Sequence, residues 1–219
     1  MRLRRKPWID EAIHDYDSHI ILSGQENYKG KWREAFSHPE RPLYMELGTG
    51  KGRFIAGMSE AHPDANFVGF EVQIGVIYYA VQKIFEAERD NAKVSLFDIA
   101  GIEEIVAPGE VDRFYINFCD PWPKAKHAKR RLTYHTFLDR YARLLKDNGE
   151  VHFKTDNEGL FMFSLEEFQN CGWKLKNVTY DLHSTDLPNV KTEYEEKFSA
   201  KGQPIFRLEA VKPAATKEA

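Results

Sequence analysis

From Pro42 onward, the chain alternates short apolar runs with segments of helical length, and this alternation constrains the fold most strongly. Apolar residues recur at helical spacing in 54–58 and 74–87, and each of these segments lies between two apolar runs. Strands that are separated by helices form parallel βαβ units. We therefore expect an α/β fold built on a mostly parallel sheet. The expected strands of its first half are 43–47, 66–71, 94–98 and 114–118.

The second half continues this pattern but ends differently. Apolar residues predict a helix over 137–145, which Asp147-Asn148-Gly149 would close, because glycine and asparagine favour helix ends. The last two expected strands lack an amphipathic crossover of helical length, so we expect an antiparallel edge. We treat residues 1–219 as a single domain, with 1–40 as an N-terminal extension and 212–219 as a frayed tail. The remaining expected elements are strands 151–155, 173–179 and 205–208, a helix over 159–170 and a charged helix around Tyr194.

Composition limits the partners and the compartment. The net charge of −3 at pH 7 excludes a globally basic nucleic-acid binder. Electrostatic binding of a polyanion must therefore come from two local basic patches, 2–6 (Arg2, Arg4, Arg5 and Lys6) and 124–131. Two cysteines are too few for a disulfide framework, and the eight histidines lack metal-ligand spacing, so we expect no metal. No apolar run approaches the ~18–20 residues of a membrane-spanning helix, and no signal-peptide segment is apparent. We expect a soluble, cytoplasmic protein.

The strand at 43–47 leads into a glycine-rich turn, Glu46-Leu47-Gly48-Thr49-Gly50-Lys51-Gly52. Closely spaced glycines between a strand and a helix let a ligand approach the backbone. A dinucleotide fingerprint needs glycine at position 53, which is arginine, and a phosphate-binding loop needs Ser or Thr where Gly52 stands. The acidic Glu46 also disfavours an anion. The turn therefore suits a cationic ligand that carries an ammonium and a sulfonium group.

Carboxylates stand at the ends of four successive strands or strand loops, at Glu46, Glu71, Asp98 and Asp120. Ligands in open α/β sheets bind along the edge where the strands end, so these side chains are candidates for one site. Glu71 follows Gly50 by 21 residues, about the spacing at which an acidic residue meets the hydroxyls of an adenosine ribose. Asp98 is a candidate for the adenine amino group. Taken singly, each carboxylate is more often a capping or solvated residue.

The segment Phe114–Arg131 combines a strand end, a rigid loop and a basic run. Its two prolines cannot donate backbone hydrogen bonds, so the strand must end there and Asp120 is held on a stiff loop beside Trp122. Five basic residues follow within the eight positions 124–131. This combination suits a site that grips a base and holds a phosphate backbone nearby. Cys119 could be a nucleophile for methylation of pyrimidine C5, but a buried, inert thiol is the favoured interpretation.

Four blocks of sequence occur together in this chain: Glu46–Gly52, Asp120–Arg131 (DPWPKAKHAKRR), Lys154-Thr155-Asp156 and Thr192-Glu193-Tyr194-Glu195. Together they resemble the bacterial tRNA (guanine-N7)-methyltransferases, and the resemblance runs from about residue 20 to 210. The second block is highly specific, whereas the glycine turn alone would indicate only a class I methyltransferase. The resemblance implies a Rossmann-like class I methyltransferase fold with helices on both faces of the sheet. It also implies S-adenosylmethionine as donor and the guanine at position 46 of the tRNA variable loop as acceptor.

The resemblance further implies roles for individual residues. The residues that would line the donor pocket are Glu46, Gly48, Thr49, Gly50, Glu71, Asp98 and Asp120. Those that would face the guanosine are Lys124, Asp156, Thr192, Glu193, Tyr194 and Glu195. Those that would contact the RNA are Lys126, His127, Lys129, Arg130 and Arg131.

Methyl transfer to guanine N7 needs no proton abstraction, because N7 has an exposed lone pair and carries no hydrogen. The product base is cationic, so catalysis would rest on alignment and on carboxylates that favour the developing charge. Asp120 is the leading candidate for this catalytic role. Asp156, or Glu193 and Glu195, could accept hydrogen bonds from guanine N1–H and the exocyclic amino group, a pattern that adenine cannot mimic.

Three alternatives remain. Another class I methyltransferase, acting on an amine of DNA, protein or a small molecule, would carry an Asn-Pro-Pro-aromatic loop, whereas this chain has Asp120-Pro121-Trp122-Pro123. A non-catalytic RNA-binding subunit would have a degenerate pocket, whereas Glu46–Gly52 is intact. A nicotinamide-dependent dehydrogenase is disfavoured by Arg53. The sequence therefore predicts a methyltransferase that uses S-adenosylmethionine and acts on tRNA.

Overall fold

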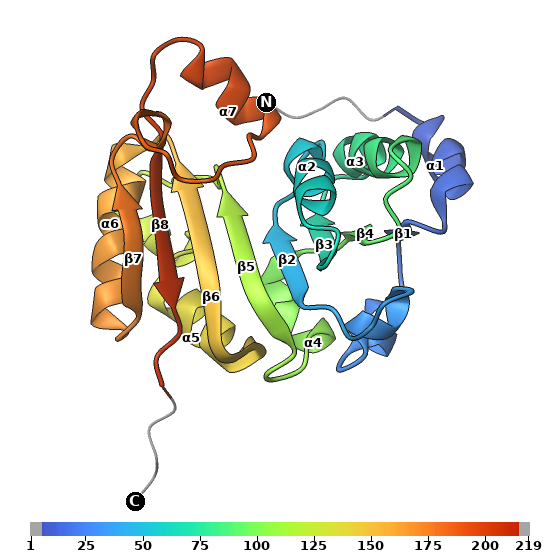
Figure 1. The fold of residues 1–219 in the computed structure, drawn as a ribbon, viewed down its shortest axis with the longest axis horizontal. Coiled ribbons are helices and arrows are strands. Elements are labelled where there is room, and N and C mark those ends of the chain that lie inside the picture. The colour runs from blue at the N-terminus through green and yellow to red at the C-terminus, as the bar shows by residue number, and fades with distance from the viewer. Residues whose placement is uncertain (1–5, 215–219) are drawn as a thin grey trace, which may run out of the picture. The chain divides into compact units, whose positions relative to one another are not determined.

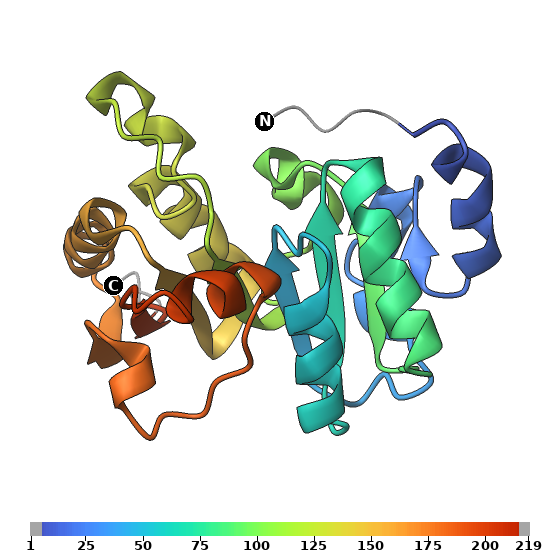
Figure 2. The same cartoon turned by 90° about the horizontal axis from the view of Figure 1, so that it is seen from above.

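The computed structural model describes residues 6–214 and divides into two compact units (Figure 1, Figure 2). The first unit comprises 6–107 and Val190–Glu193, and the second comprises Pro108–Asn189 and 194–214. The basic residues predicted at 2–5 and the tail beyond 214 lie outside the described residues. The expectation of a single domain remains a prediction.

The first unit carries a sheet of parallel strands. Its elements are β1 (Ile20–Ile21), β2 (Leu43–Leu47), β3 (Asn66–Glu71), β4 (Ala92–Leu96), α1 (Ile9–Ala12), α2 (Arg53–Ala61), α3 (Ile74–Glu86) and α4 (Ile102–Ile105). The strands follow the order β1-β4-β3-β2, and every pair in this series is parallel. Glu46 pairs with Gly69, and Gly69 pairs with Val94, so β2, β3 and β4 end along the same edge. The parallel βαβ pattern predicted for this half is confirmed, while the two-residue β1 had no signal in the sequence.

The two faces of this sheet are covered by different parts of the chain. A Cβ added at Gly69 would lie 2.8 Å from Thr49 and 2.9 Å from Ile55, so this face of β3 lies against the glycine turn and α2. The next residue, Phe70, points to the opposite face and meets the Trp32 ring edge-on at 5.7 Å. Trp32 is fully buried, and its indole N–H donates to the carbonyl oxygen of Ile105 at 2.7 Å. Part of the expected N-terminal extension therefore belongs to the core of this unit.

The second unit carries a mixed sheet. Its elements are β5 (Val111–Asn117), β6 (Leu145–Thr155), β7 (Lys174–Thr179), β8 (Phe206–Val211), α5 (His135–Leu144), α6 (Glu158–Asn170) and α7 (Glu193–Ser199), which begins at the last residue of the first unit. The order is β5-β6-β8-β7; β5 and β6 are parallel, and β8 is antiparallel to both β6 and β7. The predicted antiparallel edge is confirmed, with β8 between its two partners and β7 outermost. α5 and α6 lie on one face of these strands (Figure 1).

The boundary between α5 and β6 differs from its prediction. Leu145 was expected to close a helix, but it is the first residue of β6 and pairs with Val111. The Asp147-Asn148-Gly149 turn therefore lies within the residues assigned to β6, where Asn148 has a φ of +61°. Asparagine tolerates this left-handed conformation better than most residues do. The turn signal was correct, but the helix ends one residue earlier than predicted.

The longest helices among residues 6–214 are α3 and α6, with 13 residues each. A helix of that length extends about 20 Å, which is shorter than the ~30 Å hydrocarbon core of a bilayer. No helix in this part of the chain is long and apolar enough to cross a membrane.

Candidate active site

The glycine turn after β2 presents open backbone. Gly48, Gly50 and Gly52 have φ values of +90°, +58° and +81°, a region that other residues enter only with strain. A Cβ at Gly52 would lie 2.6 Å from Ala80, so this glycine allows α2 and α3 to approach each other. A Cβ at Gly48 or Gly50 would meet nothing within 4 Å. The turn therefore leaves space beside its first two glycines, where a ligand could lie against the backbone.

Glu46 lies directly beneath this turn. Its side chain is buried, and its Oε2 accepts a hydrogen bond of 2.6 Å from the Thr49 hydroxyl. The backbone N–H groups of Gly48 and Thr49 both donate to the carbonyl oxygen of Phe70, at 3.0 and 2.8 Å. These bonds fix the turn to the end of β3 and place a buried carboxylate next to it. A buried negative charge favours a cationic ligand over an anion.

Glu71 is the second carboxylate at this edge. Its Oε1 accepts from the backbone N–H groups of Val72 and Gln73, both at 3.0 Å, and its Oε2 accepts from that of Gly50 at 3.2 Å. Burial raises the pKa of Glu71, and the three backbone donors act in the opposite direction. A carboxylate has about four acceptor positions, so the Glu71 carboxylate can also accept from the hydroxyls of a ribose. The structure thus brings Glu46, Thr49, Gly50 and Glu71 together, as predicted for a donor pocket.

Asp98 follows β4 and is exposed. Its Oδ1 accepts a hydrogen bond of 2.9 Å from the backbone N–H of Ala100 and so caps the short 3₁₀ helix Ile99–Gly101. The backbone N–H of Phe97 donates to the carbonyl oxygen of Glu71 at 3.1 Å, which ties the ends of β3 and β4 together. Asp98 therefore has the capping role that is common for such residues, at the edge where the adenine contact was predicted.

In the second unit, β5 ends in a strained loop. Phe118 and Trp122 have φ values of +53° and +42°, which are unusual for residues with large side chains. Asp120 lies between them and is exposed. Burial, followed by the neighbouring Asp120 carboxylate, raises the pKa of the Cys119 thiol to about 12. A thiol with this pKa stays protonated at neutral pH, which agrees with the inert-thiol interpretation.

The basic run after this loop does not behave as one group. Lys124, Lys126, Lys129 and Arg130 are exposed, and the guanidinium of Arg130 lies 4.8 Å from the centre of the Trp122 ring. The half-buried His127 meets the Trp122 ring edge-on at 5.7 Å. Arg131 is also half-buried and donates to the backbone of the loop. Of the five basic residues in this run, Lys124, Lys126, Lys129 and Arg130 are thus on the surface, where they can meet RNA. The fifth, Arg131, forms its hydrogen bonds with the protein itself.

Asp156, which follows β6, forms a polar cluster with α7. Its Oδ2 accepts from the Tyr194 hydroxyl at 2.9 Å and from Gln203 at 3.0 Å. Burial and then this hydrogen bond raise the pKa of Tyr194 to about 12. The centres of the Tyr194 and Phe118 rings lie 5.1 Å apart, and Tyr194 is 42% exposed, so part of its ring remains accessible to solvent. The structure therefore brings Asp156 and Tyr194 together beside the start of the strained loop.

Glu195 lies in a buried ion pair. Its carboxylate is fully buried and accepts from Lys154 at 2.7 Å and Asn189 at 2.6 Å, with His183 at 3.1 Å. Lys154 is only 4% exposed and also donates to Asn189. Lys154 belongs to one of the four sequence blocks described above, but no role could be assigned to it from the sequence. The structure identifies it as the charge partner of Glu195.

Glu193 is held in the first unit. Its Oε2 accepts from the backbone N–H of Arg53 at 3.4 Å, and its Oε1 is paired with Lys83. Lys83 also donates to the carbonyl oxygen of Lys51 at 2.6 Å. Lys83 therefore bridges the glycine turn and the residue 190–193 segment, a role for which the sequence held no signal. Thr192 is half-buried.

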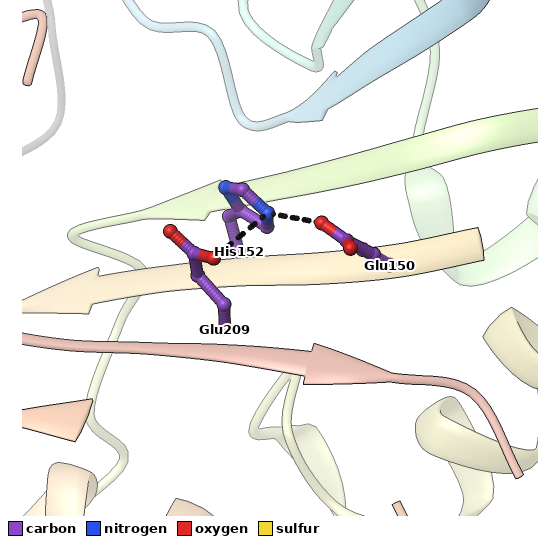
Figure 3. A group of neighbouring side chains, drawn as sticks. All are labelled: Glu150, His152 and Glu209. Atoms are coloured by element: carbon purple, nitrogen blue, oxygen red, sulfur yellow. Dashed lines mark hydrogen bonds and ion pairs between the residues drawn. The ribbon is translucent and has the colours of Figure 1, made fainter. Parts of the chain in front are cut away.

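Glu150, His152 and Glu209 form a second cluster of titratable groups, on β6 and β8 (Figure 3). Their ligand atoms lie within 4.8 Å of one another, a spacing that a metal ion could use. However, Glu150 accepts from His152 at 2.7 Å and Lys176 at 2.5 Å, and Glu209 is paired with Arg207 and accepts from Asn177. A cation would have to displace positive groups that already neutralise both carboxylates. The expectation that the protein needs no metal stays a prediction.

This cluster makes stability depend on pH. The hydrogen bond from His152 and then Lys176 and Arg113 lower the pKa of Glu150 to about 2, from an ordinary 4.5. A carboxyl group with a depressed folded-state pKa stabilises the fold above its unfolded pKa and loses this effect as the pH falls toward the folded value. As the pH falls from about 4.5 to 2, the free energy of unfolding of Glu150→Gln is therefore expected to fall less than that of the wild type. The difference between the two should be at most ~3 kcal/mol. Urea unfolding at several pH values measures this, with the exposed Glu166→Gln as control; equal acid profiles in both variants would contradict it.

Comparisons with known proteins agree with this geometry. Residues 40–208 match the model of a family described as "Putative methyltransferase". The chain is 49% identical to the tRNA (guanine-N(7)-)-methyltransferase of Bacillus licheniformis, covering 96% of this chain and 98% of that protein. It is 48% identical to the protein of that name from Bacillus subtilis, covering 95% and 98%. For the Streptococcus agalactiae protein the identity is 47%, covering 96% and 99%.

Solved structures show the same fold at low sequence identity. An antibiotic-related methyltransferase matches with a TM-score of 0.62 at 15% identity, covering 89% of this chain and 96% of that one. The 16S rRNA (adenine(1408)-N(1))-methyltransferase of Catenulisporales acidiphilia, whose structure contains the cosubstrate SAM, matches with a TM-score of 0.60 at 15% identity, covering 91% and 96%. These likenesses confirm the Rossmann-like class I methyltransferase fold. Together with the full-length identities, they show that the chain belongs to the tRNA (guanine-N7)-methyltransferase family.

Proposed function

We propose that this protein transfers a methyl group from S-adenosylmethionine to N7 of the guanine at position 46 in the variable loop of tRNA. The observation that carries the proposal is the 47–49% identity, over nearly the whole chain, to proteins named for guanine-N7 methylation of tRNA. The open glycine turn beside Glu46 and Glu71 also supports it. Because tRNA works in translation, we place this activity in the cytoplasm.

The donor would be held in the first unit. S-adenosylmethionine supplies a methyl group on a positively charged sulfur. Glu71, which already accepts from the Gly50 N–H, would accept hydrogen bonds from the ribose hydroxyls, and the open backbone at Gly48 and Gly50 would admit the methionine portion. The buried Glu46 favours the donor's positive charge, and Asp98 contacts the adenine amino group. This donor set fits a cationic nucleoside and would repel a dinucleotide phosphate.

The guanosine and its RNA would be held mainly by residues of the second unit. Asp156, with Tyr194 and Lys124, recognises the base, and the burial of Glu195 supports a contact through Asp156 rather than through Glu195. The exposed side chains of the basic run bind the phosphate backbone; these are Lys126, Lys129 and Arg130, with His127 beside them. Phosphate contacts of this kind position the RNA without reading its sequence.

The Asp120 carboxylate would act on the charge that appears during transfer. Guanine N7 attacks the methyl carbon with its lone pair, so the bond from sulfur to carbon breaks as the bond from nitrogen to carbon forms. No side chain has to remove a proton. The positive charge moves from the sulfur to the guanine, and a preorganised carboxylate beside the base would stabilise the transition state more than the ground state, in which the guanine is still neutral.

The direct experiment is incubation with unmodified tRNA and methyl-labelled donor, followed by mapping of the labelled base. We expect label at N7 of guanine 46, and none in a tRNA that carries 7-deazaguanine at that position. Label on an exocyclic nitrogen or a carbon would instead favour another class I methyltransferase. Binding of tRNA and donor without transfer would favour a non-catalytic subunit, and preferential binding of NAD would favour a dehydrogenase.

Glu71→Ala is expected to weaken S-adenosylmethionine binding by roughly 1.5–3 kcal/mol, because it removes a charge-assisted acceptor for the ribose hydroxyls. Calorimetric titration measures this, with Glu86→Ala, an exposed carboxylate at the far end of α3, as control. A ribose contact predicts the same loss for S-adenosylhomocysteine, which keeps the adenosine but lacks the positive sulfur. A loss confined to the charged donor would contradict the ribose assignment, and unchanged affinity would remove Glu71 from the site.

A further inference from the structure

Arg131 differs from its basic neighbours in what it contacts. Its Nε donates to the carbonyl oxygen of Pro121 at 3.1 Å, and its Nη2 donates to that of Trp122 at 3.0 Å. The central carbon of its guanidinium, Cζ, lies over the Phe163 ring of α6, 4.2 Å from the ring centre. The guanidinium therefore donates two hydrogen bonds to the loop and packs against an aromatic ring of the same protein. This is the geometry in which arginine cannot be replaced by lysine.

The loop that Arg131 contacts needs external support. Phe118 and Trp122, on either side of Asp120, have positive φ values that side chains rarely adopt. Strained backbone persists only where its surroundings hold it, and it gathers at functional sites. The loop also contains two prolines, which cannot form backbone hydrogen bonds as donors, so regular structure cannot stabilise it. The carbonyl oxygens of Pro121 and Trp122 both accept hydrogen bonds from the Arg131 side chain, which ties the loop down at two adjacent residues.

We infer that Arg131 is a positioning residue: it holds the Asp120 loop in its strained conformation, and so aligns the Asp120 carboxylate, instead of binding the RNA backbone as the sequence predicted. The effect on methyl transfer rests on the proposed function. The effect on the loop does not, because every contact of Arg131 described above lies within the protein.

The kinetic test compares two variants of the basic run. Arg131→Lys keeps the positive charge but loses the rigid pair of adjacent donors that meets the two carbonyl groups, so we expect kcat to fall about 10-fold or more while the tRNA KM stays within about twofold. Lys129→Ala removes an exposed charge, so we expect a higher tRNA KM, a salt slope lower by about 0.7–0.9, and little change in kcat. If Arg131→Lys keeps the wild-type kcat, or mainly raises KM with a flatter salt dependence, Arg131 is an RNA contact and the inference is wrong.

A spectroscopic test needs neither tRNA nor donor. The chain contains four tryptophans, and 5-fluorotryptophan labelling reports on each, with Trp122 assigned from Trp122→Phe. We expect Arg131→Lys to shift or broaden the Trp122 signal alone, and Lys129→Ala to leave it in place. An unmoved signal in Arg131→Lys would overturn the inference even if the enzyme acts on another substrate. Conversely, a shifted signal in a protein that methylates no tRNA would overturn only the proposed function.

Phe163→Leu provides an independent variant if Arg131→Lys unfolds. It leaves every charge in place and removes the ring on which the guanidinium lies. We expect a change in the Trp122 signal in the same direction and a smaller loss of kcat. Combining both substitutions should lower kcat no further than Arg131→Lys alone, because the two side chains act through one contact. Additive losses would contradict the inference.

Discussion

Asp120→Asn is expected to lower kcat by roughly 10- to 1,000-fold, because the amide cannot stabilise the positive charge that develops on guanine. Donor affinity should fall by a smaller factor than kcat, since the charge on guanine forms only during transfer. Steady-state kinetics with unmodified tRNA measures the effect. Asp139→Asn, an exposed residue of α5, serves as the matched control and should behave like the wild type. A wild-type kcat in Asp120→Asn would remove Asp120 from the catalytic role.

A solvent isotope effect separates charge stabilisation from proton abstraction. If Asp120 removed a proton in the methyl-transfer step, that step would be slower in D2O than in H2O. Guanine N7 carries no proton, so we expect single-turnover methyl transfer to have the same rate constant in both solvents. A clear isotope effect on this step would indicate a proton transfer and would put the N7 assignment in doubt.

Local sequence was sufficient for features that depend on neighbouring residues. The glycine turn could be predicted because three closely spaced glycines indicate backbone with positive φ. The structure has positive φ at Gly48, Gly50 and Gly52. The parallel order of β2, β3 and β4 followed from helix-length crossovers. By contrast, Leu145 fits an apolar helix position equally well, and its place in β6 is decided by pairing with Val111, far away in the chain.

Side-chain roles that depend on partners far away in the chain could not be predicted from the sequence. Glu193 and Glu195 belong to one motif and were assigned the same role. They lie two residues apart on α7, so their side chains point in different directions. Glu195 meets Lys154, 41 residues earlier, in a buried pair, and Glu193 meets Lys83, 110 residues earlier, near the surface. Arg131 is a similar case, since its charge suggested RNA whereas its contacts are two carbonyl groups and Phe163.

Glu195→Ala is expected to destabilise the fold by about 3–5 kcal/mol, because it leaves the Lys154 ammonium buried without its carboxylate partner. The Glu195 side chain is fully buried and that of Lys154 is only 6% exposed, so water cannot replace the lost partner without rearrangement. Urea unfolding in the absence of tRNA and donor measures the change.

The matched control for this prediction is Glu193→Ala, in the same motif. The Lys83 and Glu193 side chains are 40% and 35% exposed, so their ion pair is screened by solvent and its loss should cost no more than about 1 kcal/mol. Replacing both members of the buried pair, as in Lys154→Met with Glu195→Leu, should recover part of the stability, since no charge is then left unpaired. If Glu195→Ala is as stable as the wild type but fails to bind its RNA substrate, the ion pair is not structural, and Glu195 belongs with the residues that contact the guanosine.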